Sequence, residues 1–184
     1  AVTYPNGCTL YGGLRVDEYP IQVNTFNFWY FGDQAGIDFN ENQAVTDGQM
    51  SAPEGVATQS DQNGDLLFYT DGVTVWGRDH SIIGDNIGGD QRATQSVLIM
   101  PFTEDETMYY VFTTEAIFGD NTYNLNYSVV DIKENNANGA VVLKNKHLFA
   151  PSTERMAGAS RATNYMFAHE YGNNTFRAYF SAAD

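Results

Sequence analysis

The chain has 184 residues, which is enough for one domain with a sizeable core. Its 9 lysines and arginines stand against 23 aspartates and glutamates, so the formal charge is −14. That charge argues against electrostatic binding to nucleic acid or to an anionic membrane surface, because both are themselves negative. No run of about 18 apolar residues is present, so we expect no insertion into a membrane.

Two features bear on the compartment of the protein. Cys8 is the one cysteine, so no internal disulfide can form, although a secreted domain with a full core needs none. No basic residue adjoins Cys8 to lower the pKa of its thiol, and we interpret it as unreactive. The chain does not open with a basic segment and an apolar run, which suits a signal peptide already removed as well as a boundary inside a longer chain.

The chain divides into a lead segment, residues 1–25, whose role we cannot assign, and a predicted domain, residues 26–184. In the domain the apolar residues recur with a short, strand-like period, and no segment carries a 3.6-residue stripe over three turns. The predicted strands are rich in valine, isoleucine and aromatic residues. They are Thr25–Phe31, Val56–Gln59, Leu66–Thr70, Val73–Trp76, Gln95–Met100, Met108–Thr113, Leu125–Ile132, Val141–Leu148, Tyr165–Glu170 and Thr175–Ser181. The sequence therefore predicts an all-β fold.

The turn residues favour antiparallel neighbours. Asn63-Gly64 and Asp71-Gly72 are dipeptides that accept a positive φ at both central positions of a type I′ hairpin turn. Asn138-Gly139 is a similar turn signal between two predicted strands. We therefore expect the chain to meander from each strand to its neighbour.

Several predicted strands are apolar on both faces. Leu66–Tyr69, Val97–Met100 and Tyr109–Phe112 are hydrophobic at even and odd positions alike. A two-sheet sandwich buries one face of each strand, whereas the stacked blades of a propeller bury both. These strands favour a propeller-like antiparallel meander.

A weak internal repeat points the same way. Phe68, Phe112 and Phe167 lie at the centres of aromatic strands, 44 and 55 residues apart, and propeller blades span roughly 40–50 residues. The longer interval needs an insertion, for which Phe118–Asn124 is the candidate. The count predicts about three blades of a larger, incomplete propeller, with Phe26–Asn40 as a lone strand or pair before the first full blade.

Five segments, in chain order, carry a resemblance to a known family. They are Asn27–Asn40 (NFWYFGDQAGIDFN), Gly64–Trp76 (GDLLFYTDGVTVW), Thr94–Pro101 (TQSVLIMP), Tyr109–Thr114 (YYVFTT) and Tyr127–Ile132 (YSVVDI). Together they resemble the N-terminal propeller region of large secreted, gliding-motility-associated surface proteins of Bacteroidota. The most specific of them is the strand-turn-strand motif in Gly64–Trp76.

The resemblance implies an exported protein. Members of that family leave the cell as cargo of the type IX secretion translocon, so we expect an extracellular or cell-surface location and a role such as adhesion. The sorting domain and the adhesion repeats of the family are not in these residues. The family region offers no catalytic residue to carry over.

The loop that opens the Gly64–Trp76 motif is the best metal candidate. Asp61, Asn63 and Asp65 could supply hard oxygens to a calcium ion, the one cofactor that the sequence suggests. An EF-hand loop, however, has glycine at position six and glutamate at position twelve, and counting from Asp61 neither residue is in place. The competing interpretation, which we favour, is a hairpin turn.

Other side chains that could bind a ligand or a metal ion lack a diagnostic arrangement. His80, His147 and His169 have no metal-ligand spacing, and we interpret them as strand-edge or core histidines. Aromatic residues at the rim of a propeller could bind sugars, although core packing is their usual role. The tyrosines considered for such a rim are Tyr4, Tyr11, Tyr19 and Tyr30.

Three functions remain open from the sequence. The first is a non-catalytic propeller module of an exported surface protein, which binds a glycan or a surface protein. The second is a propeller-type polysaccharide hydrolase with paired carboxylates, although the sequence gives no way to choose the pair. The third is a structural domain that shields a neighbouring module. We favour the first, so we expect no enzyme.

Overall fold

The computed structural model describes residues 2–3, 9–10, 24–117, 123–160 and 163–181. In these ranges the protein is all-β, as the sequence predicted. The short strands β1 (Val2–Thr3) and β2 (Thr9–Leu10) form an antiparallel pair of their own. Four residues singled out from the sequence and most of the expected insertion lie outside the described residues: Cys8, Tyr4, Tyr11, Tyr19 and residues 118–122.

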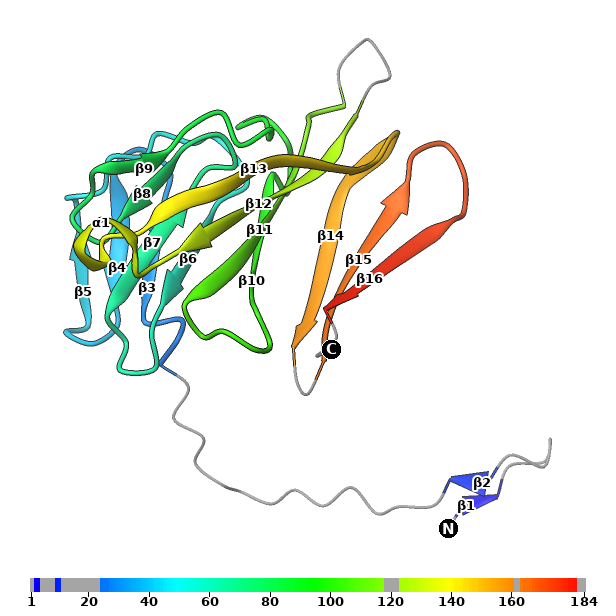
Figure 1. Ribbon diagram of the computed structural model, residues 1–184, viewed down its shortest axis with the longest axis horizontal. Coiled ribbons are helices and arrows are strands. Elements are labelled where there is room, and N and C mark those ends of the chain that lie inside the picture. The colour runs from blue at the N-terminus through cyan, green and yellow to red at the C-terminus, as the bar shows by residue number, and fades with distance from the viewer. Residues whose placement is uncertain (1, 4–8, 11–23, 118–122, 161–162, 182–184) are drawn as a thin grey trace.

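Four further antiparallel sheets follow one another along the described chain, and none closes on itself (Figure 1). The first sheet contains β3 (Phe28–Phe31), β4 (Ala35–Asp38) and β5 (Gln43–Val45). The second contains β6 (Ala57–Ser60), β7 (Leu66–Thr70), β8 (Val75–Gly77) and β9 (Ile82–Gly84). The third contains β10 (Val97–Pro101), β11 (Met108–Thr114), β12 (Leu125–Asp131) and β13 (Ala140–Phe149). The fourth contains β14 (Ser152–Ser160), β15 (Asn164–Glu170) and β16 (Phe176–Ser181).

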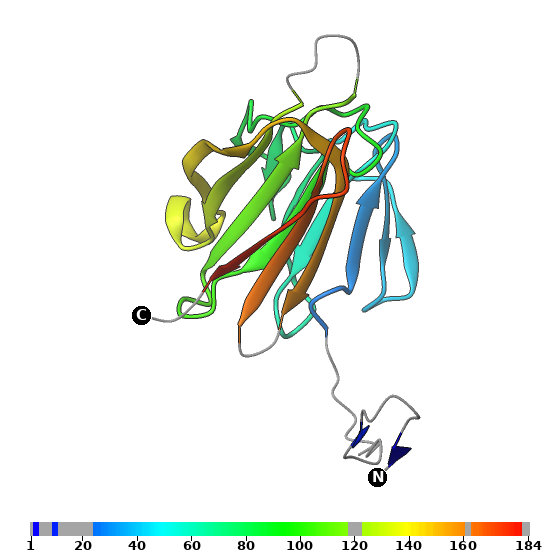
Figure 2. The ribbon, with the colours of Figure 1, turned by 90° about the vertical axis from the view of Figure 1, so that its right-hand side faces the viewer.

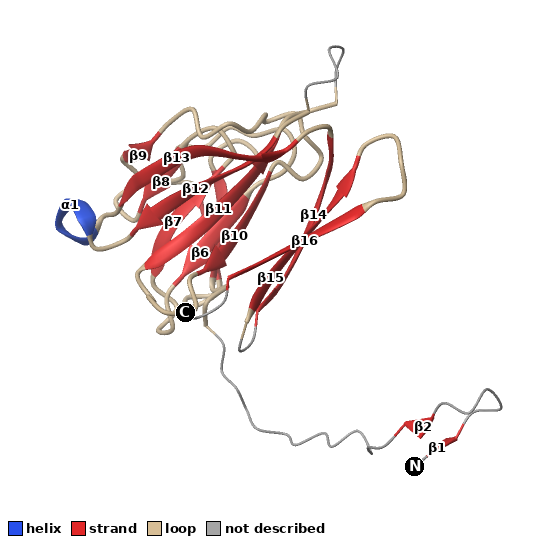
Figure 3. Ribbon diagram, turned by 45° about the vertical axis from the view of Figure 1, so that its right-hand side comes forward, coloured by secondary structure: helices blue, strands red, loops and turns tan. Residues whose placement is uncertain are grey.

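The strands of each sheet lie in chain order, so the predicted meander is confirmed. Figure 3 shows that most of the chain is strand, with loops joining the strand ends. The helical segment α1 (Glu134–Ala137) is only a tight turn between β12 and β13, with positive φ at three of its residues. No helix in the described part of the chain has the length and apolar character that a membrane span requires.

The segment Phe26–Asn40 was expected to be a lone strand or pair, and it contains the pair β3 and β4. β5 lies outside that segment and was not predicted; it extends the pair to a three-stranded sheet. Besides the β1–β2 pair, the described chain thus has four sheets. β5 was missed because it is short and contains glutamine, which lowers its β-propensity.

The two Asx-Gly turns also differ from the expectation. Gly64 (φ +94°) and Gly72 (φ +85°) have positive φ, but the residues before them do not, so neither turn is type I′. In the first turn the Asp61 carboxylate accepts the backbone N–H groups of Asn63 and Asp65, at 2.8 and 3.0 Å. Such side-chain acceptors stabilise a turn in which only the glycine needs the left-handed region.

The core lies between successive sheets, which pack face to face across the molecule (Figures 1 and 2). Tyr30, Tyr69 and Trp76 are buried between the first and second sheets. Phe68 and Val111 belong to the cluster between the second and third. All residues of β7 are buried, because this strand has a packed sheet on each face, as its two-sided apolar pattern predicted.

A further cluster joins the third and fourth sheets. It contains Phe112, Leu125 and Phe149 from the third sheet and Met156 and Met166 from the fourth. The outer faces at the two ends of the stack are different, because they leave large aromatic side chains exposed. These are Trp29, Phe31 and Phe39 on the first sheet and Tyr165, Phe167 and Phe176 on the fourth.

Side-chain hydrogen bonds tie the first strands of the sheets together, which lie side by side in the order β3, β6, β10 and β14. Thr58 Oγ1 in β6 accepts the backbone N–H of Tyr30 in β3 at 3.0 Å. Gln95, just before β10, donates to the Met156 carbonyl in β14 at 2.7 Å and accepts the Met156 N–H at 3.0 Å. Such bonds satisfy backbone groups of a strand edge that has no strand partner there.

The contribution of this core can be tested at Phe68, whose side chain is fully buried. We expect Phe68→Ala to lower the free energy of unfolding by about 3–5 kcal/mol, from lost transfer free energy plus a cavity. Phe176 is 73% exposed and provides the control, because Phe176→Ala should change stability by no more than about 0.5 kcal/mol. Urea denaturation of both variants measures the difference. Equal effects would contradict the assignment of the core.

Candidate functional site

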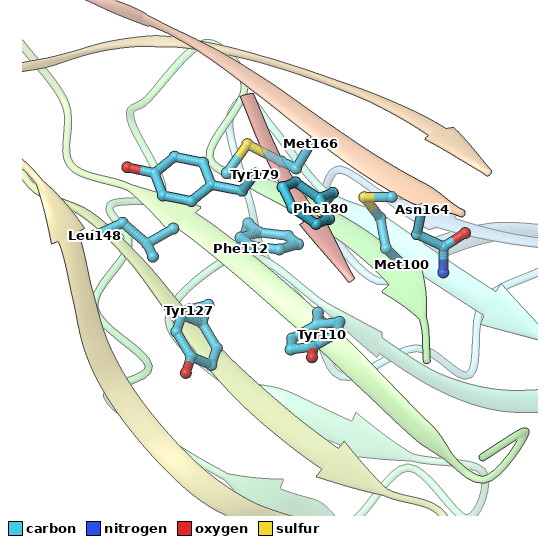
Figure 4. A pocket seen from close by; sticks show the side chains of 9 residues that line it. All are labelled: Met100, Tyr110, Phe112, Tyr127, Leu148, Asn164, Met166, Tyr179 and Phe180. Atoms are coloured by element: carbon cyan, nitrogen blue, oxygen red, sulfur yellow. The ribbon is translucent and has the colours of Figure 1, made fainter. Parts of the chain in front are cut away.

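One cleft in the described structure lies between the third and fourth sheets (Figure 4). It has a volume of about 170 Å³ and mostly aromatic and aliphatic walls. The lining residues come from six strands: Met100, Tyr110, Phe112, Tyr127, Leu148, Asn164, Met166, Tyr179 and Phe180. No segment of the sequence contains more than two or three of them, which is why sequence reasoning missed the site.

The cleft exists because the third and fourth sheets contact one another through their first strands. β14 lies against β10 and β11, whereas β16 reaches the third sheet through the side chains of Tyr179 and Arg177, which pack on Phe149. The junction between the second and third sheets is filled differently. There β9 contacts β13, and Ile83 and Val141 both pack against the hydrophobic cluster between the second and third sheets. The fourth sheet has no described strand in the position that β9 holds in the second, so the space beside Leu148 stays open.

Ring contacts fix the aromatic wall of the cleft in place. The Tyr110 ring stacks on Phe102 with 4.0 Å between centroids and meets Tyr127 edge-to-face at 5.8 Å. Phe112 lies 5.7 Å from Tyr110. Offset and edge-to-face pairs of this kind stabilise one another beyond their buried area, so the wall is largely formed before any ligand arrives.

The opposite wall of the cleft is stabilised by the ion pair of Arg177 and Glu170 at its edge. Tyr179 stacks against Phe149, and the Arg177 guanidinium lies over the same Phe149 ring at 4.6 Å. Arg177 Nε also donates to Glu170 Oε1 at 2.6 Å. Hydrogen bonds from Asn173 and then from Arg177 hold the pKa of Glu170 below its usual value, so this pair is charged at neutral pH.

The size and chemistry of the cleft limit what it can do. Small-molecule sites usually measure roughly 300–1,000 Å³, so a volume of about 170 Å³ has room for a single side chain or ring. Its polar groups are tyrosine hydroxyls and the Asn164 amide, and none of the lining residues is acidic or basic. The arrangement suits binding rather than acid–base chemistry.

The residues predicted to hold calcium lie in the hairpin turn between β6 and β7. Asp61 Oδ1 accepts two backbone N–H groups of its own turn, as a capping side chain does. Among the described residues no group of three or more histidine, cysteine, aspartate or glutamate side chains is placed to hold a metal ion. The calcium site stays a prediction, and the turn provides the competing account of the same residues.

A polar network that the sequence did not reveal joins the first and second sheets. Tyr30 donates its hydroxyl to Asp47 Oδ1 at 3.0 Å, and the other Asp47 oxygen lies 3.5 Å from His80 Nε2. His80 Nδ1 is 3.1 Å from the Tyr69 hydroxyl, which accepts the Gln49 N–H at 3.0 Å. Burial, and after it the hydrogen bond to Asp47, raises the pKa of Tyr30.

This network is structural. Tyr30 and Tyr69 are almost fully buried and stack at 4.5 Å, so neither hydroxyl is open to a substrate. Tyr30 was considered as an exposed rim residue, and that idea was wrong because its ring faces the second sheet rather than solvent. His80, interpreted as a strand-edge or core histidine, does lie at the junction of two sheets.

Glu154 and Asp90 lie close enough to be considered as a catalytic pair of carboxylates. Glu154 in β14 accepts the backbone N–H groups of Thr94 at 2.7 Å and Ile117 at 2.6 Å. Burial acts to raise the pKa of Glu154, but these hydrogen bonds outweigh it and lower the pKa. Its negative neighbour Asp90 is held by Arg92, 2.7 Å away. In the described chain every aspartate or glutamate pKa that departs from its ordinary value is lowered.

No protein-family model, no curated protein and no solved structure matches this chain. The resemblance to secreted surface proteins therefore rests on the quoted sequence segments alone.

The calcium prediction can be tested by thermal melting with calcium and with a chelator. At a free calcium concentration of 100 times the dissociation constant, a bound ion raises the free energy of unfolding by about 2.7 kcal/mol. For a chain of this size that corresponds to a rise in Tm of roughly 5–10 °C. We expect no such shift, because the Asp61 carboxylate is already used within its own turn. A calcium-dependent rise in Tm that Asp61→Ala removes would contradict this expectation.

Glu154 provides a test of pH dependence. Its folded pKa lies below the unfolded value, so its stabilising effect is complete above about pH 4.3 and is lost as the pH falls through the folded pKa. We expect Glu154→Gln to cost about 1 kcal/mol at pH 7, less than for a fully buried carboxylate because the group is partly exposed. Urea denaturation from pH 7 to pH 3 should show the difference shrinking. A constant difference would contradict the assignment.

Proposed function

We propose that this chain is a non-catalytic binding module of an exported cell-surface protein, and that the cleft between the third and fourth sheets is its binding site. One observation carries the proposal: a preformed aromatic cleft, open to solvent, whose lining contains no acidic or basic side chain. Apolar clefts with a few polar groups are the usual form of a binding site. A glycan or a surface protein is the partner class.

We also propose that the four sheets are successive blades of an incomplete propeller. Each is an antiparallel meander, and the first strands β3, β6, β10 and β14 lie next to one another, as the innermost strands of blades do. The exposed aromatic side chains at both ends of the stack, such as Trp29 and Phe167, suit faces that further blades would cover.

The second candidate, a polysaccharide hydrolase, has one observation in its favour. Asp90 and Glu154 are close enough for the charge of Asp90 to act on the pKa of Glu154. A glycosidase, however, needs a general acid whose pKa is raised, whereas the pKa values of both groups are lowered. The balance favours binding without catalysis.

The route of export is part of the same proposal. The five quoted segments, the charge of −14 and the single cysteine suit a soluble module that travels as cargo of the type IX secretion system to the outside of the outer membrane. The full reading frame tests this point, because a type IX sorting domain at its C-terminus is the expected finding. A cytoplasmic protein without one would overturn it.

Binding and catalysis can be separated in one set of assays. We expect a glycan array and a pull-down from cell-surface extracts to reveal a partner, and a panel of chromogenic glycosides to show no turnover. Tyr179→Ala should weaken partner binding at least tenfold, because it removes one wall of the cleft. Phe39→Ala is the matched control, since Phe39 is exposed on the first sheet at the other end of the stack. Turnover that Glu154→Gln abolishes would overturn the proposal.

A further inference from the structure

The side chains that join the first and second sheets include a stack of three aromatic rings. Tyr69 lies at its centre, with 4.5 Å between its ring centroid and that of Tyr30 and 5.4 Å to that of Trp76. The ring planes of the two pairs are 24° and 12° apart, so the rings face one another. All three side chains are buried. Phenol and indole rings lose an electron more easily than most side chains, and here they lie in contact in the core.

The hydrogen bonds of Tyr69 determine where its hydroxyl proton points. The hydroxyl oxygen accepts the backbone N–H of Gln49 at 3.0 Å. The single hydroxyl hydrogen is then directed to His80 Nδ1, 3.1 Å away, and this nitrogen is the acceptor. The network thereby assigns the ring proton of neutral His80 to Nε2, which faces Asp47 Oδ2 at 3.5 Å. Tyr69 therefore donates to a base that is itself directed at a carboxylate.

Tyr30 has a proton acceptor of its own, because its hydroxyl donates to Asp47 Oδ1 at 3.0 Å. Both acceptors reach the surface, since the side chains of His80 and Asp47 are 22% and 58% exposed. Burial raises the pKa of Tyr30 and of Tyr69, so both phenols keep their protons at neutral pH. The stack thus combines oxidisable rings that are shielded from solvent with proton acceptors that contact it.

This combination meets the requirements for one-electron oxidation of a buried phenol. A phenol that loses an electron becomes a strong acid, and its proton must leave before a neutral radical can form. An isolated charge is costly in the core, so the proton needs an acceptor that is already in contact. His80 Nδ1 provides that acceptor for Tyr69, and the Asp47 carboxylate lies beside the imidazolium that forms.

We propose that Tyr69 and His80 form a redox site that reduces one-electron oxidants of the class of oxygen-centred radicals. Tyr69 gives one electron to the oxidant, its O–H bond breaks, and the proton forms a new N–H bond at His80 Nδ1. The products are the reduced oxidant, a neutral tyrosyl radical and an imidazolium beside Asp47. Tyr30 and Trp76 extend the site, because an electron passes readily between rings in contact. This activity goes beyond the proposed binding function and does not involve the cleft.

Flash photolysis of the whole chain tests the redox site. A tris(bipyridine)ruthenium complex, excited by a laser flash and quenched by a cobalt(III) salt, supplies a one-electron oxidant, and its positive charge suits a protein of charge −14. We expect a long-lived tyrosyl radical, identified by its absorption and its EPR spectrum. It should form more slowly in D2O than in H2O, because a proton moves together with the electron.

Three variants assign the radical to a residue. Tyr69→Phe keeps the ring but removes the hydroxyl, so we expect the yield of the long-lived radical to fall at least tenfold. Tyr165→Phe is the matched control, because Tyr165 is exposed on the fourth sheet, and its yield should stay within twofold of the parent. His80→Asn removes the base, and asparagine tolerates the φ of +63° at this position. We expect this variant to form the radical at least tenfold more slowly.

A long-lived radical that depends on both Tyr69 and His80 supports the proposal. The proposal is overturned if no such radical forms or if the radical persists in Tyr69→Phe. A rate of formation that is the same in D2O and in His80→Asn also overturns it. Should Tyr69→Phe not fold, His80→Asn and the solvent comparison on the parent chain decide the question. The binding assays with Tyr179→Ala are separate, so either proposal can fail without the other.

Discussion

The structure depends on one constraint: strands that are apolar on both faces must have a packed sheet on each side. β7 shows this most clearly, because all of its residues are buried. Tyr69 turns to Tyr30 and Trp76 on one side, and Phe68 turns to Tyr109 on the other. Burial of each such aromatic ring stabilises the fold by on the order of 2–3 kcal/mol. A sheet without one of its neighbours would therefore lose the stabilisation from several buried rings at once.

Because the sheets stack face to face, the backbone hydrogen-bonding groups at their edges need partners other than strands of the neighbouring sheet. At the first strands the hydroxyl of Thr58 and the amide of Gln95 bond to backbone groups of a neighbouring sheet. At the outer strands β9 reaches β13, whereas β16 is the last described strand of the fourth sheet. The cleft beside Leu148 follows from that difference between the described strands of the fourth sheet and those of the two sheets before it.

The sequence predicted local structure well where the pattern was strong. The bounds of Leu66–Thr70 agree with β7, and the other predicted strands agree to within a few residues. β4, β5, β9 and β14 were missing from the predicted strands because they are short or consist largely of glycine, small and polar residues, and for such segments tertiary pairing outweighs intrinsic propensity. The Asx-Gly turns were located correctly, but their conformation also depends on the carboxylates of Asp61 and Asp71, which accept backbone hydrogen bonds that no dipeptide rule includes.

The candidate site shows more clearly what could not be predicted from the sequence. Tyr110, Tyr127 and Tyr179 are far apart in the chain, and their aromatic character predicted only that they were core or rim residues. The predicted calcium residues, by contrast, are adjacent in sequence, which made them easy to notice but says nothing about convergence in space. Tyr30 was judged by its neighbours in the chain, although its environment comes from Asp47 and Tyr69.

The amino-acid order alone therefore established the all-β class, the antiparallel meander and the need for cover on both faces of the strands, because these follow from periods of two residues and from local turn chemistry. Folding in three dimensions determined which faces meet, how the His80 network joins two sheets, and that aromatic side chains of the third and fourth sheets line one cleft. Those properties depend on distances between strands that lie tens of residues apart, and a period of two residues carries no information about such distances.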